Sequence, residues 1–470
     1  MESLSRIEPG NAETETGCGS ALLQPNEAAS PAFRGHRLPS PARAWWTVAV
    51  LTGLYALSLM DRQIIALVVN DIRRDLGVSD FAIGLLNGLA FAFFYVSFGL
   101  LFGWASDRYS RRGLIAAGLS LWSIATAACG LARTMPQILI ARFAVGAGEG
   151  SLNPSAYSLI ADSFPRERLS TATSVFGAGS HLGASMSLLA GGLLLSAMPA
   201  DGLAIPLIGT LEPWRAVFLL LGLPGLIVML LVWTIADPGR RADGADRGAE
   251  TPSVRTTLRA MKAQRRFYIG HNLGYALMMS ASYGYAAWAP TFLIRNLDVP
   301  VATIGAMMAT MAIGVGMTAS IAAGYIVDRL FARGMHDAPL RLYAVLAWVQ
   351  LAALIGVASA TSVTAFILAS SVFIGASSYP GVAAAALQLV APVSARGQIS
   401  AVYMSTTGLL GPGVGPVLVG LLTTFLFRND ASVGWGIAGA GMVLLPIASV
   451  CLILAMKPMR EHFAGSQNPA

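Results

Sequence analysis

The amino-acid sequence predicts an all-α membrane protein, with twelve transmembrane helices arranged as two pseudo-symmetric six-helix bundles. The 470 residues are 55% hydrophobic and only 12% charged, and their mean hydropathy is +0.63. Soluble chains carry about 25% charged residues, so this chain has too few to cover a soluble surface. Its apolar residues fall in blocks of about 20, the length that crosses a hydrocarbon core. A short polar motif also occurs twice, once in each half of the chain.

The same composition excludes several other classes of protein. A transmembrane β-barrel would show ten-residue segments of alternating hydrophobicity, and the sequence has none. Although the pI is near 9.5, basic residues of membrane proteins collect in cytoplasmic loops, so we expect no nucleic-acid partner. The three cysteines lack metal-ligand spacing. Without a catalytic triad, a metal cluster or a phosphate-binding loop, we expect neither an enzyme nor a cofactor.

The chain divides into five segments. The first is rich in Pro, Ala, Ser, Glu and Gly and has no apolar core followed by a cleavage site, which predicts a disordered tail and not a signal peptide. In order, the segments are a cytoplasmic tail (1–44), an N-terminal six-helix bundle (45–235), a cytoplasmic linker (236–265), a C-terminal six-helix bundle (266–456) and a cytoplasmic tail (457–470). The predicted spans are 45–70, 81–104, 113–133, 136–161, 170–199, 214–235, 266–293, 301–327, 341–359, 361–390, 399–427 and 433–456.

The positions of Lys and Arg predict the orientation. Most of the 31 basic residues fall in segments that are cytoplasmic if both termini are inside, and basic residues of short loops stay on the cytoplasmic side. A basic stretch at the end of the linker is able to form a short helix on the membrane surface. We therefore expect both termini in the cytoplasm.

The two halves repeat a motif in equivalent loops. The pattern Gly-x-x-x-Asp-Arg-x-x-x-Arg-Gly begins at Gly103, after the second span, and again at Gly324, after the eighth. The same offset of 221 residues carries the start of the first span onto the start of the seventh. Such a repeat predicts two parallel halves with a substrate site between them near the membrane midplane.

These spans and motifs resemble the major facilitator superfamily over residues 45–456. The loop that begins at Gly103 is similar to the superfamily's signature, with Ser110 in place of the second glycine. Several features resemble the spinster-like branch in particular. They are that serine, Met60-Asp61-Arg62 in the first span, Gly146-Ala-Gly148-Glu149 in the fourth, and the turn from Asp162 to Arg168.

The resemblance implies a secondary active transporter that works by rocking of its two halves. Members of the branch resemble one another in exporting amphipathic molecules, lipids among them, so the resemblance implies a small-molecule or lipid-like substrate. It also implies an integral protein of a bacterial inner membrane, surrounded by membrane lipids. Because one chain supplies both halves, we expect the monomer to be functional.

Three charged residues within spans form the candidate proton-coupling site: Asp61, Arg142 and Glu149. Charges at membrane depth are rare and usually functional; the alternative is a static ion pair that fixes helix packing. Counted from the span ends, Asp61 and Arg142 lie about 13 Å and about 9 Å below the outer face, and Glu149 about 20 Å. Since guanidinium stays charged, we expect the two carboxyl groups to exchange protons and compete for Arg142, with Asp61 and Arg142 as the level pair.

Candidates for the substrate cavity come from both halves. Arg62 follows Asp61 and points about 100° away, toward the cavity or toward a neighbouring helix. His181 lies near the middle of its span and can titrate near neutral pH, or simply pack. The uncharged, aromatic C-terminal half facing a charged wall suits an amphipathic, anionic substrate, although each aromatic residue also fits ordinary packing. The candidates are Arg62, Asn153, His181, Tyr275, Met279, Tyr283, Ser377 and Tyr379.

The repeated Asp-Arg loops are expected to form a cytoplasmic gate. An aspartate at the end of one span can interact with a helix N-terminus in the other half, and the arginines can bridge to an acid at the end of the fourth span. The preference of basic residues for cytoplasmic loops would by itself explain the arginines. It would not explain the repeated aspartates. The expected gate residues are Asp107, Arg108, Arg112, Asp162, Asp328, Arg329 and Arg333.

We therefore expect a proton-coupled exporter or exchanger of small amphipathic molecules. A proton symporter that imports an organic anion, with Arg142 clamping its carboxylate, would use the same residues. A transporter-like membrane receptor is an alternative of another class. It is disfavoured because such receptors usually carry an added signalling domain or a long tail, and the polar tails expected here are 44 and 14 residues long.

Overall fold

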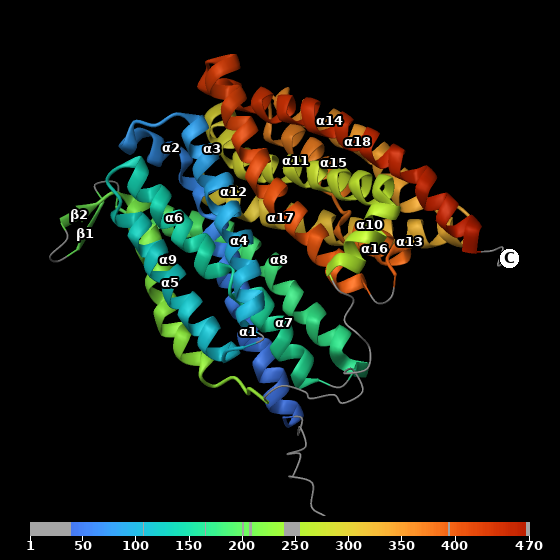
Figure 1. The fold of residues 1–470 in the computed structure, drawn as a ribbon. Coiled ribbons are helices and arrows are strands. Elements are labelled where there is room, and N and C mark those ends of the chain that lie inside the picture. The colour runs from blue at the N-terminus through green and yellow to red at the C-terminus, as the bar shows by residue number, and fades with distance from the viewer. Residues whose placement is uncertain are drawn as a thin grey trace, which may run out of the picture. The chain divides into compact units, whose positions relative to one another are not determined.

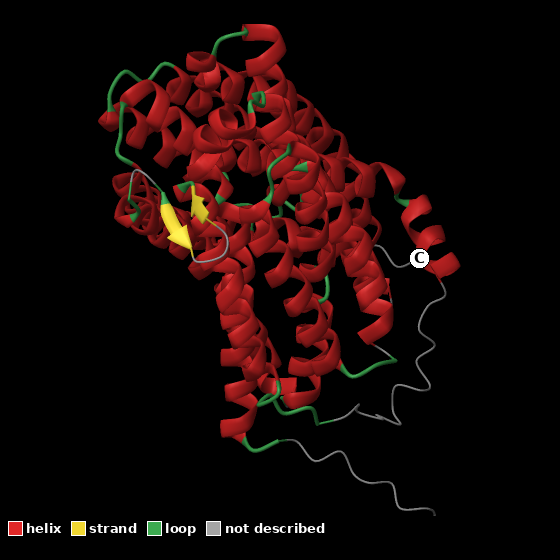
Figure 2. Ribbon diagram, turned by 90° about the vertical axis from the view of Figure 1, so that its left-hand side faces the viewer, coloured by secondary structure: helices red, strands yellow, loops and turns green. Residues whose placement is uncertain are grey.

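The computed structural model describes residues 39–106, 108–164, 166–199, 202–205, 209–238, 254–392 and 395–466, nearly all of them helical (Figure 1). Within these ranges, the strands are β1 (Leu203–Ile205) and β2 (Gly209–Leu211), an antiparallel pair in which Leu203 lies opposite Leu211. Figure 2 shows this hairpin beside the helices. The N-terminal tail is expected to be disordered, and nearly all of its residues lie outside the described ranges.

The N-terminal half matches the first six predicted spans. Three of these spans are two helices in succession, divided at Ile64, at Gly88 and at Gly150–Ser151. The helices are α1 (Pro41–Gln63), α2 (Ile65–Leu76), α3 (Asp80–Asn87), α4 (Leu89–Ser106), α5 (Arg111–Leu131), α6 (Met135–Glu149), α7 (Leu152–Ser163), α8 (Arg166–Ala197) and α9 (Pro213–Val232).

The C-terminal half matches the other six spans and adds the short basic helix expected in the linker. Its last helix continues to Ser466, ten residues beyond the predicted end of the span, so most of the expected C-terminal tail is helical. The elements are α10 (Val254–Ala263), α11 (Arg265–Leu297), α12 (Val301–Met311), η1 (Ala312–Gly316), α13 (Met317–Ala332), α14 (Ala338–Ala358), α15 (Val363–Ala376), α16 (Pro380–Val390), α17 (Arg396–Leu421), η3 (Leu422–Phe427), η4 (Asp430–Ser432) and α18 (Val433–Ser466).

Ten helical segments in the described ranges are long and apolar enough to cross a membrane. The fourth and seventh predicted spans, α6 with α7 and α11, are not among the ten, so the number twelve stays a prediction. Both contain polar groups in their interiors: α6 carries Arg142 and Glu149, and α11 carries His271 and Asn272. All four side chains are buried, so protein rather than lipid surrounds these parts of the two helices.

The two halves meet at one end of the molecule, which we call the Asp80 end (Figure 1). There α2 packs against α11, α3 against α17, and α8 against α12. A Cβ atom on Gly420 of α17 would lie only 2.4 Å from the backbone oxygen of Asp80 in α3. Only glycine allows the two helices to approach so closely. At the opposite end, which we call the Asp162 end, no ion pair or side-chain hydrogen bond joins described residues of one half to those of the other.

Candidate functional site

Glu149, the last residue of α6, lies with its side chain fully enclosed by protein. Its carboxylate oxygen Oε2 accepts a hydrogen bond from Ser58 Oγ at 2.6 Å and lies 2.6 Å from Arg62 Nε. Both partners belong to α1 and are four residues apart, so one face of α1 holds the carboxylate. The second oxygen, Oε1, is buried and has no hydrogen-bond partner.

Close helix packing at two glycines directs the side chain of Glu149 toward α1. A Cβ atom on Gly148 would lie 2.7 Å from the backbone oxygen of Gly118 in α5, and one on Gly146 would lie 2.6 Å from the backbone oxygen of Phe91 in α4. The backbone of α6 therefore touches both neighbouring helices on the glycine sides. The glutamate projects in the remaining direction, where α1 offers its two partners.

Asp61 and Arg142 are in contact, as expected for residues at similar depth. They do not meet through their charged groups, however: Arg142 Nη1 donates to the backbone carbonyl oxygen of Asp61 at 3.3 Å, and Thr126 of α5 donates to Asp61 Oδ2 at 3.2 Å. Each charged side chain is 1% exposed. Asp61 Oδ1 and Arg142 Nε have no hydrogen-bond partner, an uncommon condition for buried polar atoms.

The pairing differs from the expectation that both carboxylates compete for Arg142 and that Glu149 stands apart. The ion-pair partner of Glu149 is Arg62, whose guanidinium also lies over the rings of Phe91 and Tyr95, at 4.6 and 4.4 Å from their centroids. Arg62 occupies the last turn of α1, one turn after Ser58, and therefore shares the face that meets α6. The sequence left the direction of Arg62 open, and it gave no role to Ser58 or Thr126.

A cavity between the two halves adjoins these charges. The N-terminal half contributes two guanidinium groups to its wall, whereas the C-terminal half contributes a tyrosine and apolar residues. In this conformation the cavity has a volume of about 30 Å³, and its lining combines cationic and apolar groups. The lining residues are Leu59, Arg62, Gln63, Asn87, Phe91 and Arg142 from the first half and Tyr283, Ala286, Ala287, Pro412 and Pro416 from the second.

The other expected cavity residues lie elsewhere. Tyr275 is fully buried inside the C-terminal half, where its hydroxyl donates to the backbone oxygen of Pro339 at 3.0 Å. Tyr379 packs beside it, with ring centroids 5.8 Å apart. Eight residues along a helix turn the side-chain direction by about 80°, so Tyr275 and Tyr283 face different neighbours. For Tyr275 and Tyr379 the packing alternative is therefore the better description.

Three further candidates have local partners. Asn153 donates to the Tyr95 hydroxyl at 2.8 Å, and its own side-chain oxygen is buried without a partner. Met279 packs toward Gly411, and Ser377 donates to the backbone oxygen of Phe373 at 2.7 Å. His181 belongs to α8, but its side chain lies outside the described part of the structure.

The signature loop of the N-terminal half is held within that half. Arg111 forms ion pairs with Asp162 and with Asp237, the latter at 3.1 Å. Arg112 donates to the backbone oxygen of Ile235 at 3.1 Å. The cation that contacts Asp162 is thus Arg111, which the sequence interpretation passed over in favour of its neighbours. Arg111 reaches Asp162 because it is the first residue of α5 and its side chain points into the bundle.

The remaining expected gate residues that the structure describes lie on the surface. Arg108 is exposed and lies over the Trp104 ring at 4.1 Å, whereas Asp107 lies outside the described residues. In the second loop, Arg329 donates to the Tyr325 hydroxyl at 2.8 Å. Asp328 and Arg333 are exposed as well.

The fold and the site together define a helical, multi-pass membrane transporter with a charged cavity between two halves. The profile of the Major Facilitator Superfamily matches residues 51–416. The chain belongs to this superfamily.

Relatives place the chain in the spinster-like branch. An MFS-type efflux pump of Mycolicibacterium smegmatis is 26% identical over 426 residues, which cover 88% of this chain and 92% of that protein. Protein spinster of Drosophila melanogaster is 26% identical over 264 residues, and protein spinster homolog 1 of Homo sapiens is 29% identical over 265. These two alignments cover 56% and 55% of this chain but only 41% and 47% of those relatives.

Solved structures share the fold. A bacterial homologue of the human lysosomal transporter Spinster, in an inward-facing and unoccupied conformation, superposes with a TM-score of 0.78 at 23% identity. The alignment covers 92% of this chain and all of that one. A structure described as inward-facing and occupied gives a TM-score of 0.70.

Proposed function

We propose that this transporter exports or exchanges a small amphipathic molecule by alternating access, with the movement coupled to protons. One observation carries the proposal: Glu149 shares one carboxylate oxygen with Arg62 and Ser58 while the other is buried without a partner. A proton and the Arg62 cation compete for this carboxylate. Proton binding at Glu149 and substrate binding at Arg62 are therefore linked, each altering the affinity for the other.

Asp61 is the second proton-exchanging carboxyl group in this proposal. It has one oxygen bonded to Thr126 and one without a partner, and it adjoins the cation of Arg142. Because guanidinium does not release its proton, Arg142 keeps a positive charge at the cavity wall throughout the cycle. Protons then load and leave at the two carboxyl groups, while the two arginines respond to the substrate.

The substrate class follows from the two walls of the cavity. Arg62 and Arg142 suit an anionic group, and Tyr283 with its apolar neighbours suits a hydrocarbon or aromatic body. Export is supported by the likeness to an efflux pump over most of the chain. The proposed setting is a bacterial inner membrane, with a monomer whose two termini are cytoplasmic.

In that orientation the Asp162 end is cytoplasmic, and the signature loops close it in the other half of the cycle. The exposed residues Asp328, Arg329 and Arg333 are then able to reach the loop of Asp107, Arg108 and Arg112 or the helix ends beside it. Arg111 and Asp162 belong to the fixed part of this gate, since they are already joined within one half.

A proton symporter that imports an organic anion is the second candidate. The observation that favours it is the unpartnered Nε of Arg142 beside the cavity, which suits a carboxylate clamp. The direction of proton-linked flux in inside-out and right-side-out vesicles separates the two candidates, because an exporter that exchanges protons moves substrate and protons in opposite directions.

The proposed function is tested with purified protein in proteoliposomes that contain a pH-sensitive dye. A thermal-shift panel of lysophospholipids, fatty acids, organic acids and amphipathic drugs first identifies a stabilising compound. With that compound, the parent protein is expected to move protons across the membrane, and Glu149→Gln and Asp61→Asn are expected to abolish the movement. Full proton-linked transport by both variants would contradict the proposal.

A further inference from the structure

The short helix α10 presents two different faces. Thr257 and Met261 are four residues apart and therefore share one face of the helix. This face is turned inward, since Thr257 is 3% exposed and Met261 packs against the main hydrophobic core. Leu258, Arg259 and Lys262 are exposed, with Leu258 at 57%. The packing of the inner face thus fixes the direction of the outer one.

Further contacts attach α10 to the C-terminal half. The helix packs against α17 and α11. Gln264, the one residue between α10 and α11, has its Nε2 atom 2.9 Å from Nδ1 of His462, in the last turns of α18. The next residue, Phe463, packs against Phe331 and His336, with ring centroids 5.5 and 4.9 Å apart. The helix is therefore part of the C-terminal half and not a loose tether between the halves.

Four cations are exposed on α10 and at the start of α11. Arg259 and Lys262 belong to α10, and Arg265 and Arg266 are the first two residues of α11. We call these four residues the α10 basic patch. The sequence has no acidic residue over 251–297, and none of the four forms an ion pair with a residue that the structure describes. The described residues thus leave the positive charge of the patch uncompensated.

Exposed apolar side chains flank the patch. Leu258 lies one turn before Lys262, and Ile269, which is 62% exposed, lies one turn after Arg265 and Arg266. Basic residues that cluster directly beside a membrane span or on an amphipathic helix bind anionic lipid headgroups. Their long side chains keep the apolar stems on apolar surroundings while the charges reach the phosphates. A soluble polyanion would gain nothing from Leu258 and Ile269, so the apolar flanks favour a lipid.

We propose that the α10 basic patch binds the phosphate groups of anionic phospholipids, with Leu258 inserted among their acyl chains. The last turn of α11 contacts Asp80 through Arg295, so the start of α11, with the patch, lies at the Asp162 end. That the leaflet at this end is the cytoplasmic one rests on the proposed function, whereas lipid binding requires no substrate and no proton. Each cation near an anionic surface contributes about fivefold to the equilibrium constant for docking.

The test measures how deeply a spin label at position 258 enters the membrane. Leu258→Cys is labelled with a nitroxide after Cys18, Cys129 and Cys451 are changed to alanine, and the purified protein is placed in nanodiscs of phosphatidylcholine alone or mixed with phosphatidylglycerol. Collisions with oxygen report immersion in the bilayer, and collisions with a neutral nickel chelate report exposure to water. Both leaflets carry the same lipids, so the result does not depend on the orientation of the protein.

The label is expected to be exposed to water in phosphatidylcholine alone and immersed when phosphatidylglycerol is present. It is expected to return to water at high salt, since the Debye length falls from about 10 Å at 0.1 M to about 3 Å at 1 M. Lys262→Gln and, independently, Arg259→Gln are expected to lower the ratio of immersed to water-exposed labels about fivefold each.

Arg43→Gln is the matched control. Arg43 is an exposed cation near the start of α1, at the same end of the molecule but in the other half, and its ratio is expected to match that of the parent. The proposal is overturned if the label stays in water with phosphatidylglycerol, or if it is equally immersed without that lipid, which would indicate apolar contact only. It is also overturned if the two patch variants lower the ratio no more than Arg43→Gln does. Because no substrate and no pH gradient are used, a failure of transport leaves this result unaffected.

Discussion

Glu149 and Arg62 form an ion pair of 2.6 Å between α6 and α1, within the N-terminal half and beside the cavity that the two halves share. The glutamate side chain is fully buried and the arginine side chain is 16% exposed, so the pair is desolvated on one side and reachable from the cavity on the other. A ligand that enters the cavity meets the arginine first. The pair is thus placed to relate the occupancy of the cavity to the state of a buried carboxyl group.

Glu149→Gln is expected to remove proton-linked transport while leaving the fold intact. The amide has nearly the shape of the carboxyl group and still accepts from Ser58, but it binds no proton. We expect the proton flux that accompanies substrate movement to fall at least tenfold, measured with the dye-filled proteoliposomes. Ser58→Ala is the control, since it removes one hydrogen bond to the same oxygen and keeps the carboxyl group. An equal loss in both variants would indicate a packing role for this position.

Arg62→Gln is expected to destabilise the protein because it leaves the Glu149 carboxylate buried without its cation. Removing one partner of a buried ion pair costs about 3 to 5 kcal/mol. In a Glu149→Gln background the same change is expected to cost much less, because no charge remains to be compensated. The free energy of unfolding of the four proteins, from chemical denaturation in detergent, gives the interaction energy directly. Additive effects of the two substitutions would contradict the pairing.

Helix positions were predictable because apolar blocks of about 20 residues have few other solutions in a bilayer. Depth within a span is counted from its ends, which is why Asp61 and Arg142 were expected close together, and the two residues are in contact. Rotation about the helix axis is not fixed in this way. The direction in which a side chain points depends on how the helices pack against one another, so the contact between Arg62 and Glu149 could not be read from spacing.

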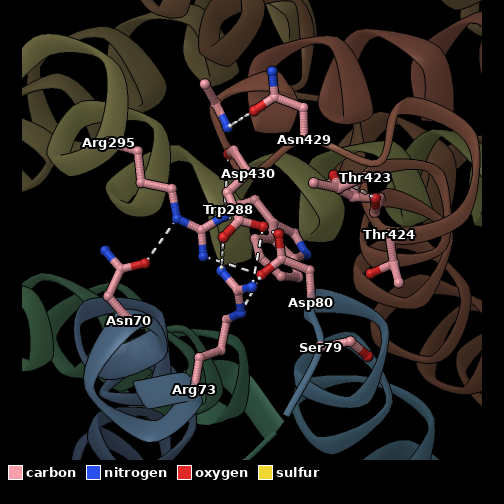
Figure 3. Close-up of polar contacts among 12 residues, drawn as sticks. Asn70, Arg73, Ser79, Asp80, Trp288, Arg295, Thr423, Thr424, Asn429 and Asp430 are labelled. Atoms are coloured by element: carbon pink, nitrogen blue, oxygen red, sulfur yellow. Dashed lines mark hydrogen bonds and ion pairs between the residues drawn. The ribbon is translucent and has the colours of Figure 1, made fainter. Parts of the chain in front are cut away.

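The ion pair between Asp80 and Arg295 (Figure 3) was missed for a different reason. Asp80 and Arg295 are separated by 215 residues, and each lies near the end of a span, where charged residues are common and need no special explanation. No repeated motif marks them. Their significance depends on how the first half docks on the second, which no local pattern encodes. The signature loops show the converse: their motif is conspicuous in the sequence, yet Asp328 and Arg333 lie exposed in this conformation.

Gly148→Ala is expected to destabilise the protein and to disturb the site at the adjacent residue. The new Cβ atom would lie 2.7 Å from the backbone oxygen of Gly118 and 2.8 Å from the backbone nitrogen of Trp122, and backbone atoms cannot yield as a flexible side chain does. Overpacking of this kind costs about 1 to 3 kcal/mol. Thermal unfolding and proton flux are measured together, since α6 must move away from α5 and carry Glu149 with it.

Gly53→Ala is the matched control for that substitution. Gly53 is exposed in the middle of α1, and a Cβ atom there would meet nothing within 4 Å. Alanine is the better helix former by up to about 1 kcal/mol, so stability is expected to stay level or rise slightly. A loss in Gly53→Ala equal to that in Gly148→Ala would mean that glycine flexibility, and not close packing, matters in these helices.

Arg111→Gln is expected to weaken the Asp162 end within the N-terminal half. Its side chain is 3% exposed and contacts two carboxylates, Asp162 and Asp237, which are 17% and 15% exposed. Loss of this cation leaves two poorly hydrated charges and is expected to lower the free energy of unfolding by about 2 kcal/mol. Arg108→Gln, three residues earlier in the same motif, changes an exposed side chain that lies over Trp104 and is expected to shift stability by less than about 0.5 kcal/mol. Chemical denaturation of both variants compares them directly, and equal effects would show that the ion pairs of Arg111 do not stabilise this bundle.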